Sequence, residues 1–136
     1  MLKDIPELKV EDVAFAIVKK EKDEHGESGW FVYLINMQEQ PITGILITST
    51  GYGKIDEFDR KSSTLRHFLE TLPGRSFVKI EPIVEDVFML SNEYWLSYFQ
   101  DGNMYDKKFI FLPGSITEEN FTTIPLMHTK GVLIKS

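Results

Sequence analysis

The stretch Tyr94–Leu112 reads YWLSYFQDGNMYDKKFIFL, and it decides the fold class of this chain. Two runs rich in aromatic residues flank the dipeptide Asp101-Gly102, and both of its positions tolerate positive φ angles. Such a dipeptide between two strand-like runs is the strongest short-range signal for a β-hairpin. We therefore predict one strand over 94–100, a tight turn, and a second strand over 104–112.

Other short runs of the same kind lie along the rest of the chain. Residues 30–35 (WFVYLI) are aromatic or aliphatic throughout, which is typical of a strand buried on both faces. A polar turn over 38–41 separates this run from 42–50, and we predict that the two runs form one antiparallel hairpin. Further strands are expected over 13–17, 77–80 and 131–134.

The segments between these runs carry turn and helix signals. Gly51-Tyr52-Gly53 is expected to end the second of these strands, and residues 54–63 read as a polar, acidic connector. Residues 64–69 fit either a helical face or a short strand. A single helical turn is expected over 85–90, and Ser115–Glu118 matches a capping box, which predicts a short helix there.

The pattern as a whole is about seven or eight short strands with turn signals between them and no long amphipathic helix. It favours an all-β protein, an antiparallel β-sandwich that is immunoglobulin-like in general architecture, with one or two short helical turns. A small, partly open β-barrel is the alternative. The length of 136 residues fits a single β-sandwich domain over 1–136.

Composition excludes several kinds of chemistry. The chain has no cysteine, which excludes disulfides, thiolate zinc sites, iron–sulfur clusters and cysteine nucleophiles. The formal net charge is -6, whereas nucleic-acid binding needs a basic footprint. The first residues lack the apolar run of a signal peptide, and no apolar run reaches membrane-spanning length. We expect a cytoplasmic protein that binds neither nucleic acid nor membrane.

Motifs for catalysis and for cofactors are missing. The sequence holds no G-x-x-x-x-G-K-[ST] phosphate loop and no G-x-S-x-G nucleophile elbow. The three histidines, His25, His67 and His128, lie far apart, whereas catalytic zinc ligands are usually closely spaced. We therefore expect no catalytic residue, no metal site and no cofactor.

Two groups of residues leave a second hypothesis open, that of a small metal-dependent or acid/base hydrolase. His67 and Glu70 are three apart, so they share a face in a helix but lie on opposite faces of a strand. Asp56 and Asp59 lie close together after a glycine-rich turn, and hard cations prefer such oxygen ligands.

The aromatic residues favour a different function. Alternation along the strand 94–99 places Trp95 on one face and Tyr98 on the other, so both faces are apolar or amphipathic. One face has to build the core, and the other is free to contact a partner. Our leading hypothesis is a non-catalytic binding or assembly module that self-associates or binds a protein partner, and a carbohydrate-binding module is a weaker alternative. The candidate contact residues are Tyr52, Trp95, Tyr98 and Tyr105.

Six further segments of the chain form a recognisable set: YLIN (33–36), GYG (51–53), STLRHF (63–68), KIEP (79–82), NEYW (92–95) and YDKKFIFLPGSI (105–116). Together they resemble a short, uncharacterised bacterial protein family, and the resemblance covers most of the chain. No function is known for that family, so the resemblance implies no catalytic residue. Some similar short proteins carry a phenylalanyl-tRNA synthetase label, but such a synthetase needs an ATP-binding arginine motif, which this chain lacks.

Overall fold

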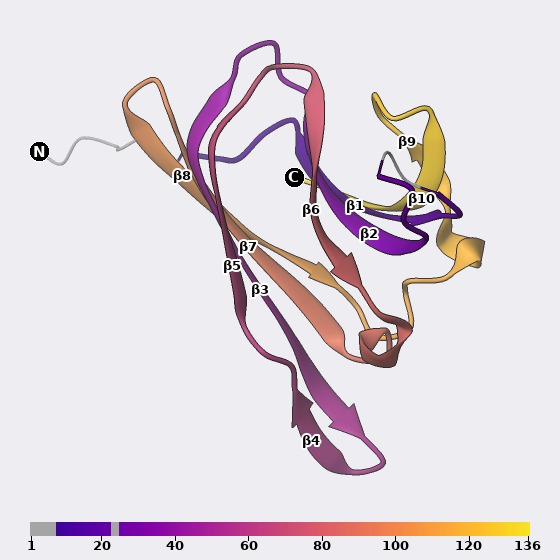
Figure 1. Cartoon of the computed structure of the whole chain (residues 1–136). Helices are drawn as coiled ribbons and strands as arrows, with labels where there is room; N and C mark the ends of the chain where they lie inside the picture. The colour runs from indigo at the N-terminus through magenta and orange to yellow at the C-terminus, as the bar shows by residue number, and fades with distance from the viewer. Residues whose placement is uncertain (1–7, 23–24) are drawn as a thin grey trace, which may run out of the picture.

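The computed structural model describes residues 8–22 and 25–136, and most of them lie in β-strands. The described strands form two antiparallel sheets (Figure 1). The first sheet has the strand order β6-β2-β1-β10-β9. Its strands are β6 (Ser76–Ile83), β2 (Gly29–Asn36), β1 (Val13–Lys20), β10 (Thr129–Lys135) and β9 (Thr122–Ile124).

The second sheet has the order β4-β3-β7-β8, and β5 pairs with β3 on the same edge as β4. Two single 3-10 turns, η1 (Glu85–Val87) and η2 (Glu118–Asn120), complete the described structure. The strands of this sheet are β3 (Ile42–Ile55), β4 (Phe58–Lys61), β5 (Leu65–Leu72), β7 (Ser91–Gln100) and β8 (Asn103–Phe111).

The predicted all-β sandwich is confirmed, and the barrel alternative is wrong, since the two described sheets do not close on each other. The described chain holds ten strands rather than seven or eight. The additional ones are β4 and β9, which are short and lie in segments that read as irregular. Short strands escape detection because three or four residues carry too little alternation to show a period.

The hairpin over 94–112 forms as predicted. Gln100 pairs with Asn103, so the loop contains only Asp101 and Gly102. Both loop residues have positive φ angles, 51° at Asp101 and 78° at Gly102. Two consecutive positive φ angles define the type I′ turn, whose twist matches that of the flanking strands.

The φ angle at Gly102 leads to a first prediction. Because an L-residue with a Cβ atom is strained at positive φ, Gly102→Ala is expected to lower the free energy of unfolding by about 1 kcal/mol. Gly102→Asn is expected to lose less, because asparagine tolerates this region. Urea denaturation of both variants measures the difference. Equal stability of the alanine variant and the original protein would exclude this role for the glycine.

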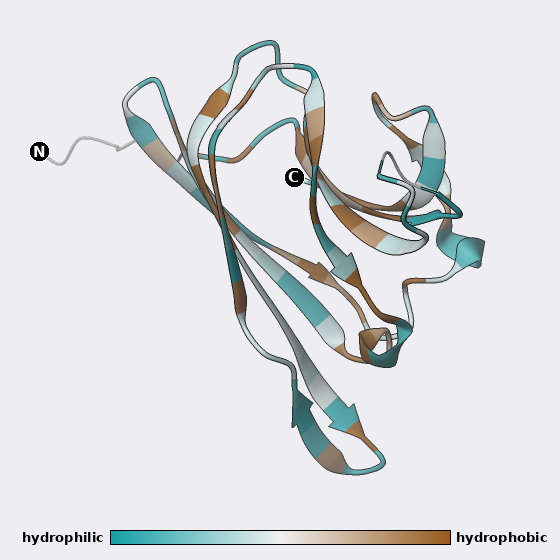
Figure 2. Ribbon diagram, viewed as in Figure 1, coloured by the Kyte–Doolittle hydropathy of each residue, from teal (hydrophilic) through white to brown (hydrophobic). Residues whose placement is uncertain are grey.

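Strands β1 and β2 are buried on both faces, as the sequence of 30–35 predicts. One face of these strands contributes Phe15, Ile17 and Leu34 to the main core between the sheets. The opposite face belongs to a second apolar cluster, to which Ile124 and Leu133 of β9 and β10 contribute. Figure 1 shows β9 and β10 in yellow at the curved end of this sheet. Hydrophobic and hydrophilic residues alternate along many of the other strands (Figure 2).

The predicted hairpin between 30–35 and 42–50 is wrong. Strand β2 pairs with β1 and β6, whereas β3 pairs with β4, β5 and β7 in the other sheet. The polar turn over 38–41 therefore carries the chain from one sheet to the other. A strand that is apolar on both faces gives no indication of its neighbours, so pattern alone could not exclude the hairpin.

Gly51-Tyr52-Gly53 does not end a strand, because β3 continues through it to Ile55. Gly51 is buried opposite Asn92, and a Cβ atom there would lie 3.2 Å from the Asn92 side-chain oxygen. The glycine thus makes room for a neighbouring side chain within the sheet. Most of the expected connector over 54–63 is instead the end of β3 and the short strand β4. Residues 65–69 of the ambiguous segment 64–69 lie in strand β5.

The capping box over Ser115–Glu118 is also wrong, although a short 3-10 turn does follow it. The N-cap residue is Thr117, and its side chain makes no capping hydrogen bond. The Ser115 hydroxyl instead donates to the carbonyl of Leu112 at 2.6 Å. The chain therefore does turn at the predicted place, but the Ser115 hydroxyl binds the preceding loop instead of capping the turn.

Candidate functional site

A buried carboxylate, that of Glu81, lies between the two sheets. Opposite β2, strand β6 has one extra residue, since Val32 pairs with Glu81 while Tyr33 pairs with Lys79. Such a bulge interrupts the alternation of a strand and turns the next side chain to the other face. Glu81 therefore faces the second sheet and is only 9% exposed.

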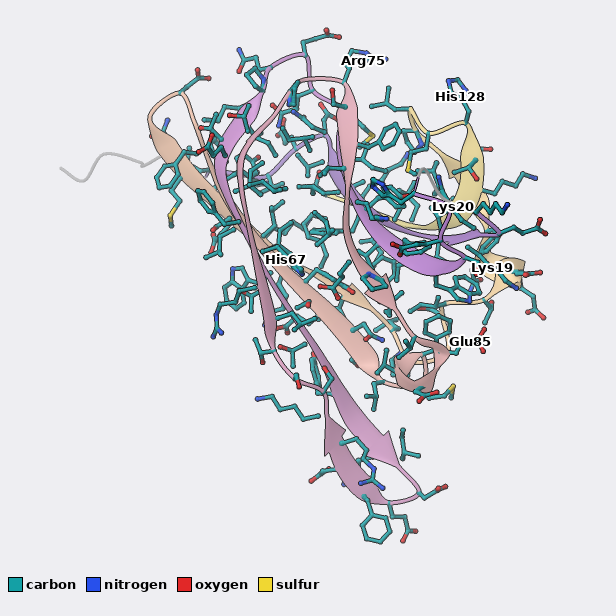
Figure 3. The ribbon with its side chains drawn as sticks, in the orientation of Figure 1. Lys19, Lys20, His67, Arg75, Glu85 and His128 are labelled. Atoms are coloured by element: carbon teal, nitrogen blue, oxygen red, sulfur yellow. The ribbon has the colours of Figure 1, made fainter. Side chains whose placement is uncertain are left out.

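Three side chains from the second sheet donate hydrogen bonds to this carboxylate. Ser49 of β3 and His67 of β5 both bind Oε1, at 2.8 Å from the hydroxyl and 2.7 Å from Nε2. The Tyr94 hydroxyl of β7 lies 3.3 Å from Oε2. Figure 3 labels His67 midway along β5. One carboxylate thereby connects an edge strand of the first sheet with three strands of the second.

The environment of the carboxylate keeps Tyr94 protonated. Burial raises the pKa of the Tyr94 hydroxyl well above its usual value, and the nearby charge and hydrogen bond of Glu81 raise it further. A phenol that does not ionise remains a hydrogen-bond donor at every pH at which the protein is handled. Tyr94 is therefore a permanent donor to Glu81.

A cavity of about 190 Å³ adjoins the Glu81 carboxylate. Leu65, Ile83, Val84 and Val87 form its apolar wall, and serine and threonine side chains are part of the remaining lining, together with Glu81 and Tyr94. Among the described residues that line it, Glu81 is the only charged one. The cavity is thus mostly apolar with one acidic end.

The residues of the hydrolase hypothesis are not brought together. Because β5 is a strand, His67 and Glu70 lie on opposite faces, and Glu70 is exposed while His67 binds Glu81. Asp56 is in the turn of the β3–β4 hairpin and Asp59 is in β4, where both are exposed. Figure 1 shows this hairpin projecting from the rest of the chain, well away from the middle of β5.

The Glu81 cluster does not have the order of a nucleophilic triad either. In such a triad the histidine lies between the carboxylate and the hydroxyl. Here Ser49 and His67 bind the same carboxylate oxygen, so the hydroxyl is paired with the acid instead of the base. In the part of the chain that the structure describes, no group of three or more histidine or acidic side chains is placed to hold a metal ion.

Exposed apolar side chains gather on the face of the second sheet that points away from the core, which we call the outer face. The backbone register places Phe68 beside Leu46, and Phe99 beside Met104, on neighbouring strands. Trp95 lies on β7 in the next row of the register, beside Thr48 and Lys108, and Ser97 separates it from Phe99 on this face. Five of the large apolar side chains on this face, with their exposed fractions, are Leu46 (41%), Trp95 (45%), Phe99 (49%), Met104 (55%) and Phe68 (66%).

Of the four predicted contact residues, Trp95 belongs to this group of five, and Tyr52 lies on the same face, because β3 pairs with β7 in unbroken register from Leu46 to Tyr52. Its ring lies 4.9 Å from the Lys108 ammonium, which also pairs with Glu93 at 3.5 Å. Tyr52 lies further along β3 and is 38% exposed. The two remaining tyrosines lie on the opposite side of the sheet.

Tyr98 is fully buried, so it is not available for a partner on the surface. Its ring stacks on that of the half-buried Tyr105 at 5.3 Å and 11°. Sequence alternation correctly separated Tyr98 from Trp95, but it did not say which of the two faces was the core.

Sequence analysis did not identify Glu81, Ser49 or Tyr94 as members of one site. The one available signal was an acidic residue inside the apolar strand sequence FVKIEPI (77–83). The bulge that turns this residue inward depends on the pairing of β6 with β2, which the sequence does not reveal.

Comparison with known proteins matches this chain to no family model, no curated protein and no solved structure. The resemblance to a bacterial family therefore stays an expectation. Among the described residues, no helix is long and apolar enough to cross a membrane. The two features of the structure that bear on function are thus the outer face of the second sheet and the cavity beside Glu81.

Proposed function

We propose that this protein is a non-catalytic assembly module that forms a homodimer through the outer face of its second sheet. The observation that carries the proposal is the grouping of five large apolar side chains, each 41–66% exposed, on four adjacent strands. Single exposed apolar residues are normal on protein surfaces, but a contiguous group of them marks an interaction site. Sheet faces of this kind pack well against one another.

The arrangement of charges favours a second copy of the chain as the partner. A two-fold dimer places the same face against itself, so the face has to be self-complementary. The register aligns the outer-face positions in two neighbouring rows across the strands. The first row is Arg66, Thr48, Trp95 and Lys108, and the second row is Phe68, Leu46, Ser97 and Asp106.

A two-fold axis that runs across the strands between these rows gives favourable contacts. It places Lys108 opposite the partner's Asp106, which pairs opposite charges. It also places Arg66 opposite the partner's Phe68, a cation–aromatic contact. Each favourable contact occurs twice by symmetry. The same axis places Trp95 opposite the partner's Ser97 and Leu46 opposite the partner's Thr48.

Sedimentation velocity at micromolar concentrations tests the proposal. Trp95→Ala is expected to weaken the dimer at least about tenfold, because a central tryptophan is a typical interface hot spot. Phe58→Ala is the control, since Phe58 is an even more exposed aromatic residue, 66% against 45% for Trp95, and lies on the projecting β3–β4 hairpin. This control is expected to associate as the original protein does.

A charge exchange identifies the partner as a second copy. Lys108→Asp and Asp106→Lys are each expected to weaken the dimer, because each change places like charges opposite each other. The double variant restores two opposite-charge pairs and is expected to recover association. A strictly monomeric original protein, or a double variant no better than the single ones, would overturn the proposed dimer. Glycan binding by a monomer through Trp95 would favour the carbohydrate alternative.

A further inference from the structure

We propose that the cavity beside Glu81 binds a small organic cation, an ammonium group carried on an apolar body about the size of one ring. This site is separate from the outer face, because Glu81 lies between the sheets and the outer face is on the far side of the second sheet. The proposal is therefore independent of the dimer.

The acidic end of the cavity has one hydrogen-bond acceptor site left for a ligand. A carboxylate offers about four lone-pair sites. Ser49 and His67 occupy the two sites on Oε1, and Tyr94 occupies one of those on Oε2. Glu81 lines the cavity, and we assign the second site on Oε2 to a bound N–H group.

The charge of the cavity selects a cation over a neutral or anionic ligand. Among the described residues, neither lysine nor arginine lines the cavity, and the basic side chain that contacts Glu81, His67, binds Oε1 from outside the cavity lining. A hydrogen bond between an ammonium group and a carboxylate is about twice as strong as one between neutral groups. An anionic ligand would place a second negative charge next to the first.

The size and the wall of the cavity define the rest of the ligand. An apolar protein cavity of about 150 Å³ takes up benzene, and this one measures about 190 Å³. The side chains of Leu65, Ile83 and Val87 provide apolar contact for one ring or a short branched chain. The space is smaller than the ~300–1,000 Å³ of sites for drug-sized ligands, so larger amines are excluded.

The bulge in β6 supports a binding role for Glu81. In regular pairing without the bulge, Ile80 would lie opposite Val32 and Glu81 would lie opposite Phe31, on the other face of the sheet. The bulge instead brings a carboxylate into a mainly apolar region, at the expense of regular strand pairing. Bulges are common next to functional sites, where they redirect a side chain.

Titration of the ¹⁵N-labelled protein with three matched probes at pH 7 tests the proposal. Benzylamine, which is protonated at that pH, is expected to shift the amide signals of Gly51, Ser62 and Val84, and to saturate at millimolar concentrations. Benzyl alcohol has the same ring without the charge and is expected to bind at least about tenfold more weakly. Benzoate is expected to cause no shift at these residues.

Two variants then test whether the charge of Glu81 is the one that binds benzylamine. Glu81→Gln keeps the size of the side chain but removes its charge, and it is expected to bind benzylamine at least about tenfold more weakly. Glu118→Gln is the control, because Glu118 is an exposed carboxylate that pairs with Lys19. If Glu81→Gln does not fold, as judged by near-UV circular dichroism, the probe series on the original protein decides.

Three results would overturn the proposal. They are equal binding of benzylamine and benzyl alcohol, shifts by benzylamine only at surface carboxylates, and no saturable shift at millimolar concentrations. The last result would assign the Glu81 cluster to a purely structural connection between the sheets. None of these results bears on the dimer, whose test is sedimentation of variants of the outer face.

Discussion

Replacing Phe15 by alanine is expected to lower the free energy of unfolding by about 3–5 kcal/mol. Phe15 lies in β1 of the first sheet and is fully buried. Its ring centroid lies 5.0 Å from that of Phe109 and 5.2 Å from that of Tyr94, both in the second sheet. Truncation therefore removes buried apolar area and leaves a cavity between the sheets. Urea denaturation, followed by the fluorescence of the two tryptophans, Trp30 and Trp95, measures the loss.

Two further variants control this prediction. Phe15→Leu retains most of the volume and is expected to cost about 1 kcal/mol. Phe58→Ala removes the same atoms from a side chain that is 66% exposed, so its cost is expected to stay within about 0.5 kcal/mol. A loss below about 1 kcal/mol for Phe15→Ala would contradict a core between these sheets. If Phe15→Ala does not fold, the stability of Phe15→Leu is compared with that of Phe58→Ala instead.

Replacing Asn36 by alanine is expected to lower the free energy of unfolding by about 2–4 kcal/mol. The side-chain amide of this fully buried residue lies 2.9 Å from the Gln40 carbonyl, 3.3 Å from that of Leu72 and 3.1 Å from that of Pro73. Its side-chain oxygen accepts from the Gln38 N–H at 3.1 Å. Alanine leaves these backbone groups without their partner, which costs more than the bonds themselves contribute.

The matched control is another asparagine-to-alanine change. Asn103 is exposed and makes one long hydrogen bond of 3.4 Å to the Asp101 carbonyl, so Asn103→Ala is expected to change stability by less than about 0.5 kcal/mol. Thermal unfolding of both variants compares the two sites. Similar melting temperatures for the two would show that Asn36 does not hold the chain together where it leaves the first sheet.

The position of Asn36 also explains why the β2–β3 pairing was predicted wrongly. The turn after β2 has the composition of a hairpin turn, and local sequence therefore favours a hairpin. What directs β3 into the other sheet is the attachment of this turn to the end of β5, which Asn36 makes through the Leu72 and Pro73 carbonyls. Those residues are 36 and 37 positions away in the sequence, so no local pattern reveals the contact.

In the candidate site, too, local sequence predicts some features and long-range contacts decide the others. Alternation along 94–99 correctly assigned Trp95 and Tyr98 to different faces, because a strand has a period of two whatever its neighbours are. Which face is buried depends on where the first sheet packs, and this made Tyr98 a core residue. Glu81 was missed because one bulge reverses the face of its side chain, and the bulge exists only in the pairing with β2.

The all-β class, the hairpin over 94–112 and the buried character of β2 follow from the amino-acid sequence alone. Each of them depends on turn chemistry, alternation or composition within about ten neighbouring residues. The choice of strand partners, the inward carboxylate and the apolar outer face were decided only by the tertiary structure. Their physical cause is long-range packing, in which a shift of one residue in register exchanges the two faces of a strand.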